Sequence, residues 1–533
     1  MTQAPDLRSR ARLNIRGSST LFQAKRNYSV EFRDEREANR DLSPLGLPEE
    51  SDWILYAPNN YEPVLIHNPF IYRLSNEIGR YAPRTRFVEV YVQTGMGSVA
   101  ASHYVGIYVL MDKIKAGPDR VDVDELEPEH TTPPNVTGGY LLKIDRLDPG
   151  DSGMVAGGQF MGFVEPKEEE IHLPQRAPQF SYIQNYIDQF GQALYAANWR
   201  DPVMGWRRYV DEAAWIDHHL LNVMAFNVDA LRLSAYFYKP RDGKLVFGPI
   251  WDFDRALNST DGRDSNPRVW RAPNGDQGTD FFNYSWWERL FQDPDFWQKW
   301  IDRYQQLRRG AFETNALFRS VDELAGQVRS AQAREVARWP GFTTPRVSYS
   351  NEVNTMKSWL GRRIHFMDTN FLAAPKALAT AVGGELEVTL SGPTGATIRY
   401  TTDGSDPRAP GGAISPMART YAGPVPVTET GVIRARSHNV QHRNLTGPNN
   451  PPISSPWSGP IEVRRATLPE SEVRVLVISE IHAHPAPPTP RELASNPLLT
   501  SEDFEFLEMA NPGETGVDLG DLRLDGGVRL AFS

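Results

Sequence analysis

The stretch FNVDALRLSAYFYKPRDGKLVFGPIWDFD, residues 226–254, carries the pattern that decides the fold of the first part of the chain. Apolar residues at helical spacing precede it and end at Phe226. Strand-like runs follow at residues 235–238 and 244–247, separated by an Arg-Asp-Gly turn. The sequence therefore predicts a helix, a loop that carries Asp229, and a two-stranded unit, in that order.

Acidic residues at two places in this stretch are candidates for chemistry. Asp229 lies in the loop between helix and strand, where an acid can serve as a catalytic base but more often makes a cap or turn. Asp252 and Asp254 follow the second strand, and carboxylates so placed can bind a hard divalent cation. The alternative is that Asp252 and Asp254 are solvated acids of a turn flanked by aromatic residues. We predict that the carboxylates of Asp229 and Asp252 converge on one pocket, which requires Tyr236 and Phe247 to lie on neighbouring strands.

The chain around this stretch alternates strands with amphipathic helices from residue 13 to about residue 372. Further strand-like runs occupy residues 13–15, 28–32, 87–92, 102–111 and 139–144. Apolar residues recur at helical spacing within 183–194 and 215–223, and a helical block is predicted from 286 to 372. This mixture predicts an α+β domain.

The composition excludes several classes of protein. Lys plus Arg number 57 against 67 for Asp plus Glu, a net charge of −10, and an acidic chain without a basic block is a poor candidate for binding nucleic acid. No apolar run approaches the roughly 20 residues that cross a bilayer, so no transmembrane segment is expected. The absence of cysteine excludes disulfides, thiolate metal sites and cysteine nucleophiles. The first residues contain no apolar segment of the kind found in signal peptides.

The length of 533 residues predicts three or four domains at roughly 150 residues each. The composition changes at residues 373–375, and residues 377–463 form short β runs separated by Gly, Pro, Ser and Thr, which indicates a small sandwich. Two strands of another β module are predicted at residues 473–481 and 504–509. The expected domains are residues 1–372, 373–466 and 467–533.

A candidate anion site lies near the start of the chain, at residues 16–25. The turn Arg16-Gly17-Ser18-Ser19 lets the backbone approach an anion closely, and Lys25, expected on the next strand, can neutralise phosphate charge. A hairpin turn with a surface lysine is the alternative. Asp112, at the end of a later strand, is expected to form an ion pair with Lys25, which should face the same cleft as Asp252.

Six runs taken in order resemble the CotH-like family, the spore coat protein H kinases. The runs are RGSS (16–19), SDWILYAPNNYEP (51–63), GIYVLMDKI (106–114), GGYLLKIDR (138–146), FNVDALRLSAYFY (226–238) and FGPIWDFD (247–254). The resemblance covers residues 13–372. It implies an atypical protein kinase with a much smaller set of elements than ordinary kinases. Such a kinase uses ATP and a divalent metal, Mg²⁺ or Mn²⁺, to phosphorylate Ser or Thr in a protein.

The resemblance also implies a role in phosphoryl transfer for each motif. Lys25 would be the lysine on the ATP phosphates, assisted by Asp112, and the Arg16-Gly17-Ser18-Ser19 turn would replace the glycine-rich loop. Asp229 would accept the proton of the attacking hydroxyl. Asp252, with help from Asp254, would hold the metal.

Several residues depart from the family pattern. Ser234, a weaker metal ligand, stands where ordinary kinases carry Asn, and Asp112 stands where many family members carry Glu. His67 and Lys143 replace a usual arginine and a usual acid. A second hypothesis therefore stays open, a non-catalytic pseudokinase or adhesive scaffold of the cell envelope that binds glycan or protein partners. Transfer of a nucleotide, or of phosphate to another acceptor, is a third.

The remaining chain resembles two β modules. Residues 396–407 and 432–435 resemble the chitobiase/β-hexosaminidase C-terminal domain, a small sandwich appended to secreted glycan-active enzymes. Residues 477–481 and 504–512 resemble the start of a lamin-tail domain, which is an immunoglobulin-like sandwich. These modules imply an extracellular or envelope location, and we expect an internal part of a longer secreted bacterial protein.

The complete expectation is a multidomain chain, with an α+β atypical protein-kinase-like domain followed by small all-β immunoglobulin-like sandwiches. The first sandwich should contact the α+β domain through polar groups. Its turn at residues 403–407 should be exposed to solvent and should lie far from Asp252.

Overall fold

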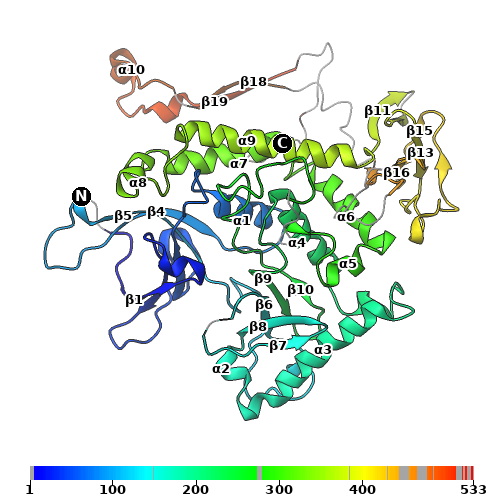
Figure 1. The fold of residues 1–533 in the computed structure, drawn as a ribbon. Coiled ribbons are helices and arrows are strands. Elements are labelled where there is room, and N and C mark those ends of the chain that lie inside the picture. The colour runs from blue at the N-terminus through cyan, green and yellow to red at the C-terminus, as the bar shows by residue number, and fades with distance from the viewer. Residues whose placement is uncertain are drawn as a thin grey trace.

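The computed structural model describes most of the chain (Figure 1). The described residues are 5–147, 149–272, 279–382, 385–428, 430–442, 455–464, 477–483, 485–511, 519, 523–524 and 530–531.

The first sheet of the α+β domain is antiparallel, with the strand order β1-β2-β3-β5-β4. Its strands are β1 (Arg10–Arg16), β2 (Asn27–Arg33), β3 (Asp52–Tyr56), β4 (Thr85–Tyr91) and β5 (Tyr104–Asp112). Four of these strands confirm runs predicted from the sequence. Strand β3 and the helix α1 (His67–Glu77) that follows it were not predicted.

The second sheet is also antiparallel and has the order β10-β9-β6-β8-β7. Its strands are β6 (Tyr140–Ile144), β7 (Met154–Ala156), β8 (Gln159–Glu165), β9 (Ala235–Lys239) and β10 (Val246–Phe247). Phe247 pairs with Phe237, and the Gly248 amide donates a hydrogen bond of 2.7 Å to the Tyr236 carbonyl. Tyr236 and Phe247 thus lie on neighbouring strands, as the convergence of Asp229 and Asp252 requires.

Besides α1, this domain contains further helices. They are α2 (Glu168–Ile171), α3 (Ala177–Tyr195), α4 (Glu212–Ala225), α5 (Trp286–Leu290), α6 (Pro294–Leu307), α7 (Thr314–Arg329), α8 (Gln332–Arg338) and α9 (Tyr349–Asn370). Figure 1 shows α7 and α9 side by side, with α8 beside the first sheet. The helical block predicted from residue 286 onward is therefore confirmed.

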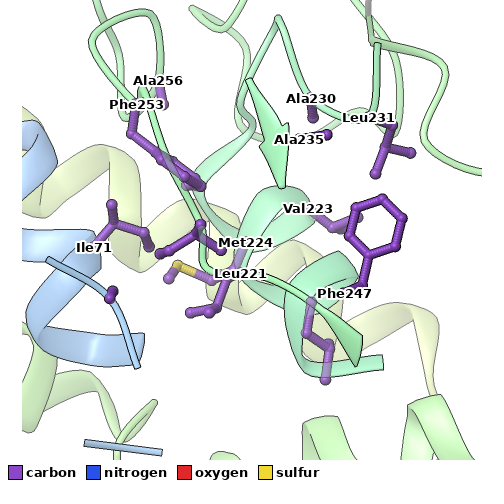
Figure 2. Close-up of a cluster of buried hydrophobic side chains, with 14 of the residues drawn as sticks. Ile71, Leu221, Val223, Met224, Ala230, Leu231, Ala235, Phe247, Phe253 and Ala256 are labelled. Atoms are coloured by element: carbon purple, nitrogen blue, oxygen red, sulfur yellow. The ribbon is translucent and has the colours of Figure 1, made fainter. Parts of the chain in front are cut away.

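One apolar core supports the segment that follows β10. Figure 2 shows Ile71 of α1, Leu221 and Met224 of α4, and Phe253 within this cluster. Phe253 is fully buried, so it anchors Asp252 and Asp254 on either side of it. Burying a phenylalanine stabilises the fold by roughly 1.5–3 kcal/mol, enough to hold the loop in one place.

The next module is a two-sheet β-sandwich, as predicted. One sheet contains β11 (Lys376–Val382), β12 (Glu385–Ser391) and β15 (Val425–Pro426). The other contains β13 (Thr397–Thr401), β14 (Arg419–Thr420), β16 (Val432–His438) and β17 (Ile461–Arg464). Its own core includes Val388, Leu390, Ile398, Ile433 and Val463, so the module has the independent core that the sequence predicted.

Polar groups join the sandwich to α6, as expected. Arg408 lies 2.6 Å from Asp295, and the buried Arg436 lies 2.6 Å from Asp302. Arg436 also lies 2.6 Å from Asp406, which is half-buried. The prediction of a solvent-exposed turn at residues 403–407 is therefore wrong at Asp406, which Arg436 draws into the domain contact, and at Pro407, which is buried.

The last part of the chain contains an antiparallel pair, β18 (Val477–His482) and β19 (Phe506–Ala510), with helix α10 (Pro490–Ser495) between them in sequence. Two short strands, β20 (Arg523–Leu524) and β21 (Leu530–Ala531), also pair. Residues 473–476 of a predicted strand lie outside the described residues. Among the helices that are described, none has the length and apolar character needed to cross a bilayer.

Candidate active site

A cleft of about 640 Å³ lies where the two sheets of the α+β domain face each other. The first sheet contributes Ile15, Ile54 and Met111, and the second contributes Lys143 and Tyr236. This volume falls within the roughly 300–1,000 Å³ typical of small-molecule sites.

Asp229 reaches the cleft because α4 ends three residues before it. Phe226 adopts a left-handed conformation with φ 53° and ends the helix. The Asn227 side chain then accepts a hydrogen bond of 3.1 Å from the Asp229 amide. The Asp229 carboxylate lies 2.6 Å from Arg232 and 3.9 Å from Arg263, so cationic side chains fix its orientation.

Asp252 lies in the same cleft, which confirms the predicted convergence with Asp229. Its backbone is left-handed, with φ 62°, a conformation that costs a non-glycine residue about 1–3 kcal/mol and is typical of functional sites. The Asp252 amide donates to the Tyr72 hydroxyl at 3.1 Å, and its carboxylate accepts a hydrogen bond of 3.4 Å from Ser234. Burial first, and then the neighbouring carboxylates of Asp254 and Asp229, raise the pKa of Asp252 well above its usual range.

Asp254 lies beside Asp252 and contacts Asn59, which precedes α1, and His67, the first residue of α1. Asn59 donates a hydrogen bond of 2.6 Å to its carboxylate, and His67 lies 3.3 Å from its carbonyl oxygen. Burial raises the pKa of Asp254 and lowers the pKa of His67 to about 4. His67 is therefore a neutral structural residue of the site at physiological pH.

Glu62 adds another acid behind this group. It is fully buried and accepts a hydrogen bond from the Tyr56 hydroxyl. Burial, reinforced by the nearby Asp254, raises its pKa to about 8. Four acids with raised pKa values thus lie near one another: Asp145, Asp252 and Asp254 line the cleft, and Glu62 lies behind them.

These acids fit a divalent cation that arrives with phosphate. Within the described ranges, no three His, Cys, Asp or Glu side chains form a complete metal site by themselves. Mg²⁺ usually takes only one or two protein carboxylates and completes its shell with water and substrate phosphates. Asp252, with Asp254 beside it and Asp145 sharing its Ser234 hydrogen bond at 3.5 Å, meets that requirement. Ser234 contacts both carboxylates, and its role in binding the metal stays a prediction.

Cationic side chains also line the cleft, and some of them lie beside its acids. They are Arg16, Lys143, Arg146, Arg232, Arg255 and Arg263. Arg255 lies 4.1 Å from the centre of the Tyr61 ring and 3.2 Å from Asp261, which holds it in place. A cleft lined by both carboxylates and cationic side chains suits a nucleoside triphosphate with its metal.

The turn at Arg16-Gly17-Ser18-Ser19 borders the cleft, as predicted. Gly17 has φ 112°, and a Cβ there would lie 2.0 Å from the Thr20 hydroxyl, so only glycine fits. Ser18 lines the cleft, and Ser19 is the first residue of a short 3₁₀ helix, η1 (Ser19–Phe22).

The predicted ion pair between Lys25 and Asp112 is wrong. Lys25 precedes β2, does not line the cleft, and places its ammonium 2.7 Å from Glu335 of α8. Asp112 pairs with Arg84 at 2.8 Å and with Arg120 at 3.3 Å, and it too lies outside the cleft lining. The structure therefore does not bring either residue to the position expected of a phosphate clamp.

The missing side chain at Gly106 leaves the space in which Glu335 reaches Lys25. Gly106 of β5 has φ 134°, and a Cβ there would lie 2.6 Å from the Glu335 carboxylate. With that space open, Glu335 also accepts a hydrogen bond of 2.7 Å from the Ile107 amide and one of 3.0 Å from Thr343. The buried carboxylate is thereby fully engaged, which a buried charge requires.

Several residues of the site were not predicted from the sequence. They are Asn59, Tyr72, Asp145, Arg232, Arg255, Arg263 and Glu335. Asn59, Asp145 and Arg232 lie inside the runs quoted for the family resemblance, so their polar character was a usable signal. Glu335 belongs to no such run, and no local pattern indicates its role.

The fold and the cleft define a multidomain protein in which an α+β domain with paired acids and arginines precedes a β-sandwich. A family model described as CotH kinase protein matches residues 13–367, and one described as chitobiase/beta-hexosaminidase C-terminal domain matches residues 379–445. The chain belongs to the CotH kinase protein family. A search of curated proteins found no match. The lamin-tail resemblance of the last module stays a prediction.

Proposed function

We propose that the α+β domain transfers the γ-phosphoryl group of ATP to a Ser or Thr hydroxyl of a protein, with Mg²⁺ or Mn²⁺ as the metal. The observation that carries this proposal is that Asp229 and Asp252 line one cleft together with several guanidinium groups. Family membership adds that the domain is kinase-like.

Asp229 is the proposed acceptor of the hydroxyl proton. Its carboxylate points into the cleft while Arg232 holds one of its oxygens at 2.6 Å. Positioning of this kind is the main contribution that a protein makes to phosphoryl transfer. Arg232 and Arg263, next to Asp229, are placed to offset the charge that develops on the transferred group.

Asp252 is the proposed principal metal ligand, with Asp254 and Asp145 in support. A bound divalent cation would neutralise phosphate oxygens and these clustered acids together. Ser234 would orient the Asp252 carboxylate through its hydrogen bond. Lys25 would act as a positioning residue, because it donates to the carbonyl of Pro58, directly before Asn59, which holds Asp254.

Two observations favour a second candidate, a pseudokinase scaffold. Lys25 is buried against Glu335 and does not reach the cleft, and Ser234 is a weaker ligand than Asn. On this alternative, the β modules would bind glycan or protein partners. The likeness of residues 379–445 to a glycosidase-associated module supports an extracellular or envelope location under either candidate.

Calorimetric titration of the full chain with ATP, with and without Mg²⁺ or Mn²⁺, tests the proposal. We expect metal-dependent binding, followed by transfer of labelled γ-phosphate to a Ser/Thr-rich protein. Metal-dependent binding without transfer would favour the scaffold. No binding of ATP in any condition would overturn the kinase proposal.

A further inference from the structure

A second cavity of about 210 Å³ lies in the α+β domain, bounded by the end of α1, by α4 and by the segment after β10. Its rim includes the exposed Gly79 and Asp122, so the cavity opens to solvent. Its apolar wall includes Leu221, Phe247 and Ile250, the first two of which appear in Figure 2. None of its lining residues also lines the cleft that holds Asp229 and Asp252.

Two buried side chains of this cavity have nitrogen atoms without a hydrogen-bond partner among the described residues. His218 is 4% exposed, and neither ring nitrogen has a hydrogen-bond partner there. Arg120 is 3% exposed, and its Nε and Nη2 have none either. Leaving such groups unpaired costs about 1–3 kcal/mol each, so they favour a ligand that can bond to them. Burial lowers the pKa of His218 to about 3, and the neutral ring offers one donor and one acceptor.

The charge around Arg120 favours an anion. Arg120 shares the fully buried Asp112 carboxylate with Arg84, at 3.3 Å and 2.8 Å respectively. One carboxylate thus serves two guanidinium groups. Asp119, 3.9 Å from Arg84, is 62% exposed, so water screens most of its contribution.

A second buried carboxylate near the cavity, that of Asp217, is also shared by two arginines. Arg80, which lines the cavity, lies 2.7 Å from the buried Asp217, and Arg303 lies 2.6 Å from the same carboxylate. Asp122 on the rim is exposed and therefore screened. The cavity is consequently flanked by two groups in which positive charge exceeds negative charge, and both carboxylates are buried.

We propose that this cavity binds a small monocarboxylate with a compact apolar body. The carboxylate would accept hydrogen bonds from Arg120 and His218, while the apolar body packs against Leu221, Phe247 and Ile250. A cavity of about 150 Å³ is known to hold benzene, so a volume of about 210 Å³ suits a molecule the size of benzoate. The proposal goes beyond phosphoryl transfer and needs neither ATP nor a metal.

Calorimetry and thermal shift with benzoate on the full, metal-free chain test this site. We expect saturable binding of benzoate, and at least tenfold weaker binding of benzamide, which has the same shape without the charge. Arg120→Met and His218→Phe should each weaken benzoate at least tenfold. Arg334→Met, which removes an exposed arginine of α8, is the matched control and should bind benzoate as the wild type does.

A crystal soaked with 4-bromobenzoate locates the ligand directly. Anomalous signal between Arg120 and Phe247 is expected. The proposal is overturned if benzoate does not bind, if benzamide binds equally well, or if the bromine lies elsewhere. It is also overturned if both variants stay folded and keep wild-type affinity. Because His218→Phe removes no ion pair, it tests the site even if Arg120→Met fails to fold.

Discussion

The ammonium group of Lys25 lies 2.7 Å from the carboxylate of Glu335, although 310 positions separate the two residues in sequence. Both side chains are fully buried. The pair therefore joins α8 to the first sheet directly behind the segment of Pro58 and Asn59 that supports Asp254.

Replacing one member of this pair should destabilise the domain strongly. Glu335→Gln or Lys25→Met leaves a buried charge without its partner, which costs about 3–5 kcal/mol. Urea unfolding measures this loss, and the double variant should lose less than the sum of the single ones. The matched control is Glu89→Gln, whose partner Arg334 is exposed, and its unfolding should change little. Equal, small losses for buried and exposed pairs would contradict the structural role of Lys25.

Glu62 should make the stability of the metal-free protein depend on pH. Burial and Asp254 raise its pKa from 4.5 to about 8, so the folded protein keeps a proton that the unfolded chain releases. Its contribution is complete below pH 4.5 and is lost as the pH rises toward 8. Between pH 6.5 and 8, Glu62→Gln should flatten the fall in unfolding free energy by up to about 1.4 kcal/mol per pH unit. Denaturant titrations in the presence of a chelator measure the unfolding free energy at each pH. Parallel profiles for the wild type and the variant would refute the raised pKa of Glu62.

Asp252→Asn should separate activity from stability. The variant should lose metal-dependent ATP turnover, because it removes the charge of the proposed principal ligand of the cation. In the absence of metal it should be more stable by roughly 1–2 kcal/mol, since a buried carboxylate repelled by Asp254 and Asp229 becomes neutral. Asp322→Asn, on the exposed face of α7, is the control and should change neither property. Retained turnover in Asp252→Asn would remove this residue from the proposed mechanism.

Asp229→Asn should lower the rate of phosphoryl transfer while leaving ATP affinity nearly intact. Loss of a general base typically slows a reaction by roughly 10²–10⁴-fold. Asparagine keeps the shape and the hydrogen bond with Arg232, so binding should change less than the rate does. Single-turnover kinetics and calorimetry on the same samples distinguish the two effects. A matched loss of affinity and rate would instead make Asp229 a binding residue.

The sequence predicted the elements that local pattern controls. The strands at β9 and β10 and the helix α4 follow from periodicity and turn residues, and they were enough to foresee that Asp229 and Asp252 meet. Strand β3 was missed, although it lies inside a run quoted for the family resemblance.

Long-range electrostatic partners could not be predicted. Asp112 pairs with Arg84 and Arg120, and Lys25 pairs with Glu335. Tertiary packing decides which oppositely charged side chain lies next to each buried charge. A single sequence contains no information about that packing. Gly106 made the second pair possible, yet a lone glycine in a strand indicates only a close approach, not what approaches.

Removing everything after Leu372 should leave a folded α+β domain that binds ATP as the full chain does. Arg436 of the sandwich is the buried partner of Asp302, so truncation removes the cation together with its module and exposes Asp302 to water instead of leaving it buried and unpaired. The same holds for Asp295, which loses Arg408. None of these residues lines the cleft of Asp229 and Asp252, so the site should keep its geometry.

Arg436→Met in the full chain is the sharper test of the domain contact. It leaves Asp302 and Asp406 facing each other without their shared guanidinium, so it should weaken docking more than truncation disturbs the α+β domain. Limited proteolysis between the two domains and calorimetric titration with ATP measure the two effects separately. We expect faster cleavage in Arg436→Met and unchanged ATP affinity in both proteins. If the truncated protein unfolds or loses ATP binding, the sandwich must be part of the catalytic unit, because its contact with α6 would then support the cleft from a distance.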